Sequence, residues 1–264
     1  MQVWRVLATY VAAVAGILTA SVIAIVALRA VFPDEPEQAL LQSLSALIAG
    51  SLASSTALIF TIAVIVRPTS PAALRLVPGW ETGRALGVAT LGMLALGQVL
   101  DSLTWLVGLG NHGSIVLVRR VLEGAGGPEL FAAVLVFGVI AGTTEEIFFR
   151  GYMQTRLRET WGPARAIVVA SLAFGVLHID VSGIHMVLAF AMGLYLGFLV
   201  ETTGSVLPAA VCHVVNNVVY TLQTALGGTL HDRRLHGVLA AGCLLLFVLC
   251  LAWLRRAAPP AAVA

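Results

Sequence analysis

Long apolar stretches, separated by short polar or proline-containing segments, occupy most of the 264-residue chain. A helix needs about 20 apolar residues to cross a bilayer, and reading the chain with a window of that length predicts eight membrane helices. Their ranges are 6–28, 40–66, 86–109, 130–158, 164–179, 184–202, 206–226 and 237–254. The pattern therefore predicts an all-α fold, a polytopic membrane helix bundle of about eight transmembrane helices that forms one domain over residues 1–264.

The composition points to the same environment. Hydrophobic residues make up 59% of the chain and charged residues only 11%, whereas soluble proteins carry about 25% charged residues. The surplus of apolar side chains needs a lipid bilayer to cover it, and we expect an integral, multi-pass protein of the plasma membrane. The net charge of +2 gives no ground for a nucleic-acid partner.

The first apolar run and the arginines indicate how the chain is oriented. Residues 6–28 exceed the roughly 7–15 apolar residues of a secretory signal, so we interpret them as a retained membrane helix. All basic residues are arginines. With the N-terminus inside, nine arginines fall in inner segments and five in outer ones, which predicts that both termini are cytoplasmic. The outer segment 110–129 is expected to include a short amphipathic helix on the membrane.

Three of the apolar helices contain polar groups where lipid should tolerate none. An ionisable group at membrane depth is costly, so by default it marks a functional site. Within each helix the polar groups lie four residues apart, on one helix face, and this spacing pairs Glu146 with Arg150. The candidate residues are Glu145, Glu146, Arg150, Phe174, His178, His213 and Asn217.

The turn near residues 161–162 brings the candidates to similar depths. Glu145 precedes it by as many residues as His178 follows it, so an antiparallel hairpin places the two side by side. His213 reaches the same level if that hairpin projects about two turns into the cytoplasm. The geometry therefore permits one shared site within a catalytic helix core at 130–226.

A carboxylate and two imidazoles around one point suit hydrolysis. Glu145 could activate a water molecule as general base, while His178, His213 and Asn217 hold that water and donate hydrogen bonds to the oxyanion. The alternative is a zinc site with His178, His213 and Glu145 as ligands. We favour the metal-free version, because these ligands come from three separate helices without an i, i+4 histidine pair.

Other polar residues are expected to lie outside the site, in structural or solvated positions. We expect Asp101 to be hydrogen-bonded locally beside Ser102 and Thr104. Asn216 points about 100° away from Asn217 on a helix and is left out of the site. The remaining histidines fall at or near predicted loops and are treated as solvated: His112, His185, His231 and His236.

The three fragments Glu-Glu-x-x-x-Arg (145–150), Phe-x-x-x-His (174–178) and His-x-x-x-Asn (213–217) resemble the motifs of the CaaX-protease and bacteriocin-processing family. Its members are intramembrane endopeptidases of the type II CaaX prenyl endopeptidase group. The resemblance covers about residues 130–226 and implies that Glu145 activates water, that His178, His213 and Asn217 complete the site, and that Glu146 and Arg150 support it. The family is described both as metalloproteases and as metal-free glutamate proteases, so the cofactor stays open.

The resemblance implies a protein or peptide substrate in the membrane. Prenylated CaaX proteins are what the eukaryotic members suggest, but the sequence favours neither these nor an unlipidated peptide. The alternative from another class is a non-catalytic membrane scaffold or a transporter on the same helix bundle. A transporter should show broken helices in corresponding halves, and the two halves here do not match.

Overall fold

The computed structural model describes residues 3–67, 69–228 and 230–259, and this part of the chain is helical without strands. Each of the eight predicted segments contains a helix, so the all-α class is confirmed. In chain order the elements are α1 (Val3–Val31), α2 (Glu37–Leu41), α3 (Leu44–Ile65), α4 (Gly83–Leu106), α5 (Ser114–Leu122), α6 (Gly127–Ala133), η1 (Val134–Ala141), α7 (Gly142–Glu146), η2 (Ile147–Gln154), α8 (Thr155–Trp161), α9 (Pro163–Leu177), α10 (Ile184–Thr203), α11 (Leu207–Ala225) and α12 (Arg233–Ala257).

Six helical segments of the described chain are long and apolar enough to cross a membrane, so the predicted number of eight spans is not established. The six are Val3–Val31, Leu44–Ile65, Gly83–Leu106, Gly127–Trp161, Ile184–Thr203 and Arg233–Ala257. The predicted helix at 164–179 forms as α9, with only 15 residues. The one at 206–226 forms as α11, which is longer, but polar residues such as His213, Asn216 and Asn217 dilute its apolar character.

Residues 127–161 form one continuous helical path of 35 residues. It continues past Arg150 to Trp161, as predicted, and breaks at Gly162, whose φ of 76° suits glycine. Two stretches of π-helix, η1 and η2, flank the five-residue α7. Such wide turns are rare in proteins overall, but those that occur are often found at functional sites. Here they flank α7, which carries Glu145 and Glu146.

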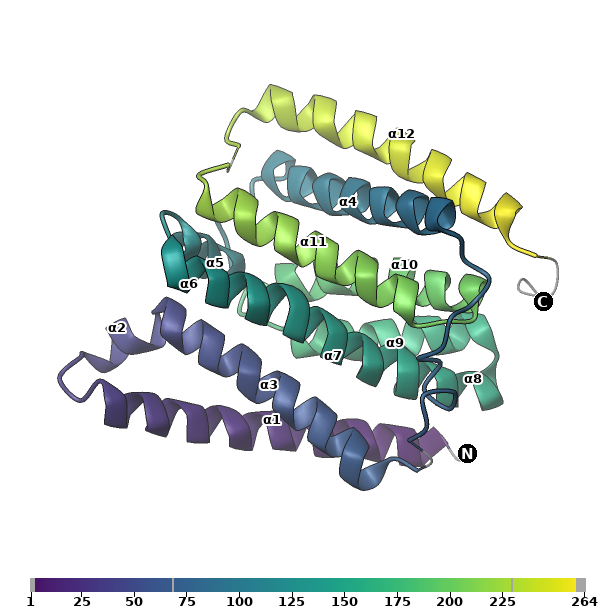
Figure 1. Cartoon of the computed structure of the whole chain (residues 1–264). Coiled ribbons are helices and arrows are strands. Elements are labelled where there is room, and N and C mark those ends of the chain that lie inside the picture. The colour runs from purple at the N-terminus through teal and green to yellow at the C-terminus, as the bar shows by residue number, and fades with distance from the viewer. Residues whose placement is uncertain (1–2, 68, 229, 260–264) are drawn as a thin grey trace.

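The helices form a layered array (Figure 1). α1 packs against α3 at one side and α12 packs against α4 at the other, while α7 and α11 lie between these pairs and α9 lies beside α10. Large apolar side chains of α1 and α12 are exposed, among them Val11, Ile23 and Leu245. Exposed apolar faces on peripheral helices are what lipid contact requires.

The start of α1 and the end of α12 lie at the same end of the array, and α5 lies at the opposite end (Figure 1). At the end that holds the start of α1, the segment between α3 and α4 is fastened to the turn between α10 and α11. The Val206 N–H donates to the Arg75 carbonyl at 2.9 Å, and the Arg75 guanidinium pairs with Glu201 at 3.0 Å. The long helix joins the same cluster through Gln154, which donates to Glu201 at 3.0 Å.

Candidate active site

Two glycines allow α11 to approach the long helix closely. A Cβ on Gly138 would lie 2.6 Å from Cγ2 of Val218, and one on Gly142 would lie 3.2 Å from the backbone nitrogen of Val214. Small residues four apart are the usual means of close helix packing in membranes. This contact brings His213 and its neighbours on α11 against α7 and its glutamates.

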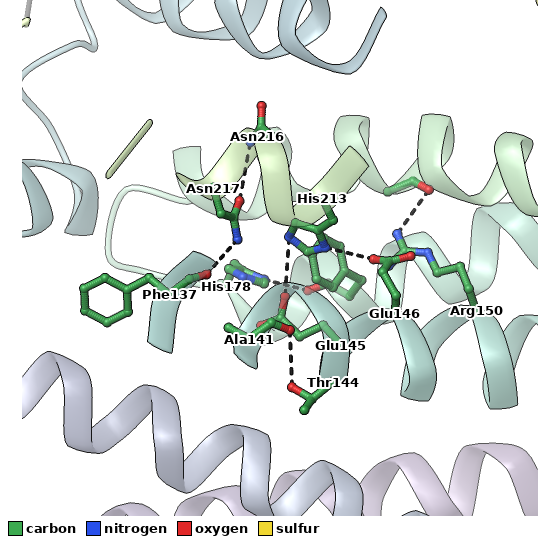
Figure 2. Close-up of polar contacts among 12 residues, drawn as sticks. Phe137, Ala141, Thr144, Glu145, Glu146, Arg150, His178, His213, Asn216 and Asn217 are labelled. Carbon is green, nitrogen blue, oxygen red and sulfur yellow. Dashed lines mark hydrogen bonds and ion pairs between the residues drawn. The ribbon is translucent and has the colours of Figure 1, made fainter. Parts of the chain in front are cut away.

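Glu146 joins the long helix to α11. Its Oε1 accepts a hydrogen bond of 2.6 Å from Arg150 and one of 2.9 Å from Nδ1 of His213. The Glu146 and Arg150 side chains are both fully buried, so the pair predicted from their spacing is present. Arg150 also donates to the Gly193 carbonyl at 3.2 Å. Glu146 thus fixes the orientation of the His213 ring (Figure 2).

Phe174 is the apolar centre of this cluster. The Arg150 guanidinium lies over its ring at 4.7 Å, and the rings of His178 and His213 contact it edge-on at 4.7 and 5.8 Å. The ring stabilises the buried Arg150 cation that lies over it. It also positions the imidazoles of His178 and His213, which pack against it. Its place in the motif therefore has a packing reason.

Glu145 faces His213 from α7 and lines the same cavity as His178. Its Oε2 lies 3.7 Å from Nε2 of His213, and its side chain keeps 17% of its surface exposed. His178, at the C-cap of α9, donates from Nδ1 to the Phe174 carbonyl at 2.9 Å. This bond leaves Nε2 of a neutral His178 as an acceptor.

Asn217 is held at the edge of the site. Its Nδ2 donates to the Phe137 carbonyl in η1 at 3.1 Å, and its Oδ1 accepts from Asn216 at 3.4 Å. The second N–H of the Asn217 amide makes no hydrogen bond within the described part of the chain. Asn216, which the helical angle placed outside the site, lines the same cavity.

A cavity of about 400 Å³ connects these groups. It extends from Glu145 and His213 to Thr104, Leu122 and Thr224, near the end of the array that holds α5. The site residues on its wall are Glu145, Phe174, His178, His213 and Asn217. The structure therefore brings the predicted candidates together from three helices, with Glu146 and Arg150 behind them.

Some of the structural or solvated roles predicted for residues outside the motifs are wrong. Asp101 pairs with Arg119 of α5 at 2.6 Å, a partner 18 residues away that local reasoning could not find. His236 is fully buried and stacks on Trp105 with 5.5 Å between the rings. His185 lines the cavity instead of facing solvent. His112 and His231 are exposed, as predicted.

His178 and His213 have tautomers that would suit a metal. Each donates from Nδ1 to a protein oxygen, which leaves Nε2 free in the manner of histidine ligands. Within the described residues, however, no three His, Cys, Asp or Glu side chains converge as a metal-binding group.

One family model matches the core of the chain. Residues 127–219 match the family model described as "Type II CAAX prenyl endopeptidase Rce1-like". No curated protein and no solved structure matches the chain. The matched residues include all three motifs, which agrees with the resemblance to the CaaX-protease and bacteriocin-processing family. The segment 127–219, which carries the candidate site, is thus similar to type II CaaX prenyl endopeptidases.

Proposed function

We propose that the protein is an intramembrane endopeptidase that hydrolyses a peptide bond of a membrane-associated or CaaX-type protein substrate with water activated by Glu145. One observation carries this proposal. Glu145 lines a cavity beside His213, while its neighbour Glu146 is fully buried with its Oε1 committed to Arg150 and His213. Adjacent carboxylates in such different surroundings are suited to different tasks.

The residues support the following sequence of events. Glu145 removes a proton from a water that Nε2 of His178 helps to hold, and the oxygen attacks the substrate carbonyl carbon. His213, with a carboxylate near each ring nitrogen, donates from Nε2 to the oxyanion when it is protonated. The uncommitted N–H of Asn217 is a second donor. Glu145 then transfers its proton to the leaving amine, and the carbon–nitrogen bond breaks.

Cleavage of a fluorogenic CaaX-type peptide by protein in nanodiscs tests the role of Glu145. Glu145→Gln retains size and hydrogen bonding but loses the basic electron pair, so turnover should fall by about 10²–10⁴-fold. His178→Ala and His213→Ala should also lose most activity. Glu129→Gln, at an exposed glutamate near the start of the same long helix, is the matched control and should cleave at the wild-type rate.

Full activity in Glu145→Gln would refute the mechanism and favour the non-catalytic scaffold or transporter. Metal content separates the two hydrolytic alternatives. The metal-free mechanism predicts cleavage that persists after chelation and dialysis. One zinc per chain whose removal abolishes cleavage would replace it with a metalloprotease mechanism.

A further inference from the structure

His185 adds a third imidazole to the cavity. It lies in the first turn of α10, and its ring contacts that of His178 with 4.9 Å between centroids and 68° between planes. Both rings line the cavity together with Glu145. None of the three motifs includes His185, and the mechanism above does not use it.

A chain of hydrogen bonds connects His185 to an aspartate. Nδ1 of His185 lies 3.1 Å from Oγ of Ser114, the first residue of α5. Ser114 in turn contacts Oδ2 of Asp180 twice, through its hydroxyl at 2.9 Å and its backbone N–H at 2.7 Å. Three segments of the chain therefore meet at this side of the cavity.

The chain determines which ring nitrogen carries the proton. Burial raises the pKa of the Asp180 carboxyl, but hydrogen bonds from Ser114, Ser182 and Gly183 outweigh this effect and hold the pKa below its usual value. The ionised carboxylate only accepts, so the Ser114 hydroxyl donates to it, and the Ser114 oxygen accepts from Nδ1–H of His185. Nε2 of a neutral His185 is then an acceptor, and no hydrogen bond in the described chain uses it.

The Nε2 acceptor of His185 could satisfy a hydrogen-bond donor of a bound peptide. A peptide that enters a largely apolar cavity loses water from its backbone N–H groups, and each one left without a partner is costly. We propose that His185 is a further substrate-contacting residue, whose Nε2 accepts a hydrogen bond from a backbone N–H of the bound peptide, and that Ser114 and Asp180 are positioning residues that hold its tautomer. This inference rests on the proposed function.

Binding measured without turnover isolates the contact. In a Glu145→Gln background, the peptide dissociation constant is measured by fluorescence anisotropy in nanodiscs. His185→Asn retains a donor near Nδ1 and loses the acceptor, so the dissociation constant should rise by about 3- to 10-fold. His185→Gln places an oxygen near the position of Nε2 and should bind more tightly than His185→Asn. A purely structural link to Ser114 predicts the reverse order.

Peptides methylated at one backbone nitrogen at a time identify the partner. One of them should bind to the Glu145→Gln parent about 3- to 10-fold more weakly than the unmethylated peptide does. The same methylation should cause no further loss of affinity when His185→Asn is added to that parent, because the same bond is already missing. Ser114→Ala should weaken binding and Ser114→Thr, which retains the hydroxyl, should restore it. His112→Asn, at an exposed histidine, is the control and should match the parent.

Equal affinities for His185→Asn and the parent would overturn the inference, and so would losses that add for every methylated peptide. Cleavage of the unmodified peptide by wild-type protein is measured in parallel. Binding with the expected pattern but without cleavage would count against the proposed function alone. Cleavage with unchanged binding in His185→Asn would count against the histidine contact alone, and a parent that binds no peptide would overturn both.

Discussion

Glu145 and Glu146 are adjacent residues whose side chains have different environments. Glu146 is fully buried and its Oε1 accepts from Arg150 and His213, whereas Glu145 retains 17% exposure on the cavity wall. A buried ion pair is sensitive to the loss of one partner, because the remaining charge is left without compensation. The two glutamates should therefore differ in their effect on stability.

Glu146→Gln should destabilise the protein by about 3–5 kcal/mol, because it leaves the Arg150 guanidinium buried and unpaired. Glu145→Gln should melt near the wild-type temperature. Differential scanning fluorimetry in detergent measures both. The double variant Glu146→Leu/Arg150→Met, which removes both charges, should recover part of the loss. Equal melting temperatures for the two glutamine variants would contradict this division.

Residue-level reasoning from the sequence could identify the groups that share a helix face. The pairing of Glu146 with Arg150 follows from their spacing, and Phe174 and His178 are likewise one turn apart. The partners of Asp101, His185 and His236 lie on other elements, and no spacing rule connects such distant positions. The tautomers of His178 and His213 also depend on oxygens that only the folded chain supplies.

At the scale of elements, apolar run length predicted the helices and the short amphipathic helix α5. It did not predict the π-helical turns of η1 and η2, because these depend on backbone hydrogen bonding that composition does not encode. It also did not predict how near α11 lies to the long helix. The signal was available in Gly138 and Gly142, four residues apart, which is a known packing pattern.

Substitutions at Gly142 test whether this close approach positions His213. The added Cβ of Gly142→Ala would lie 3.2–3.3 Å from backbone and side-chain atoms of Val214, so α11 must move by a few tenths of an ångström. Cleavage should fall in Gly142→Ala and fall further, toward about 10²-fold, in Gly142→Val. Peptide cleavage and melting temperature measure the effect.

Gly242 provides the matched control. It lies in α12, where an added Cβ meets no atom within 4 Å. Gly242→Ala and Gly242→Val should therefore retain activity and melting temperature. Wild-type cleavage by Gly142→Val would show that the spacing between α11 and α7 does not set the geometry of the site.

At the scale of the whole molecule, the chain ends predict a labelling pattern. α1 begins and α12 ends at one end of the array, and α5 lies at the other (Figure 1). Single cysteines at Ala264 and at His112, in a background without the native cysteines, should react with impermeant reagents from opposite sides. The arginine distribution predicts that Ala264 is cytoplasmic. Labelling of both positions from the same side would contradict the topology.

The position of the cavity then decides from which compartment a substrate arrives. The cavity extends from Glu145 toward α5, away from the start of α1 and the end of α12. With cytoplasmic termini, the peptide would enter from the extracytoplasmic face and its fragments would leave there, so proteolysis would be vectorial. A prenylated tail made in the cytoplasm would reach Glu145 by this route only if the bundle were inverted. Membrane orientation therefore decides which substrate classes can reach the site.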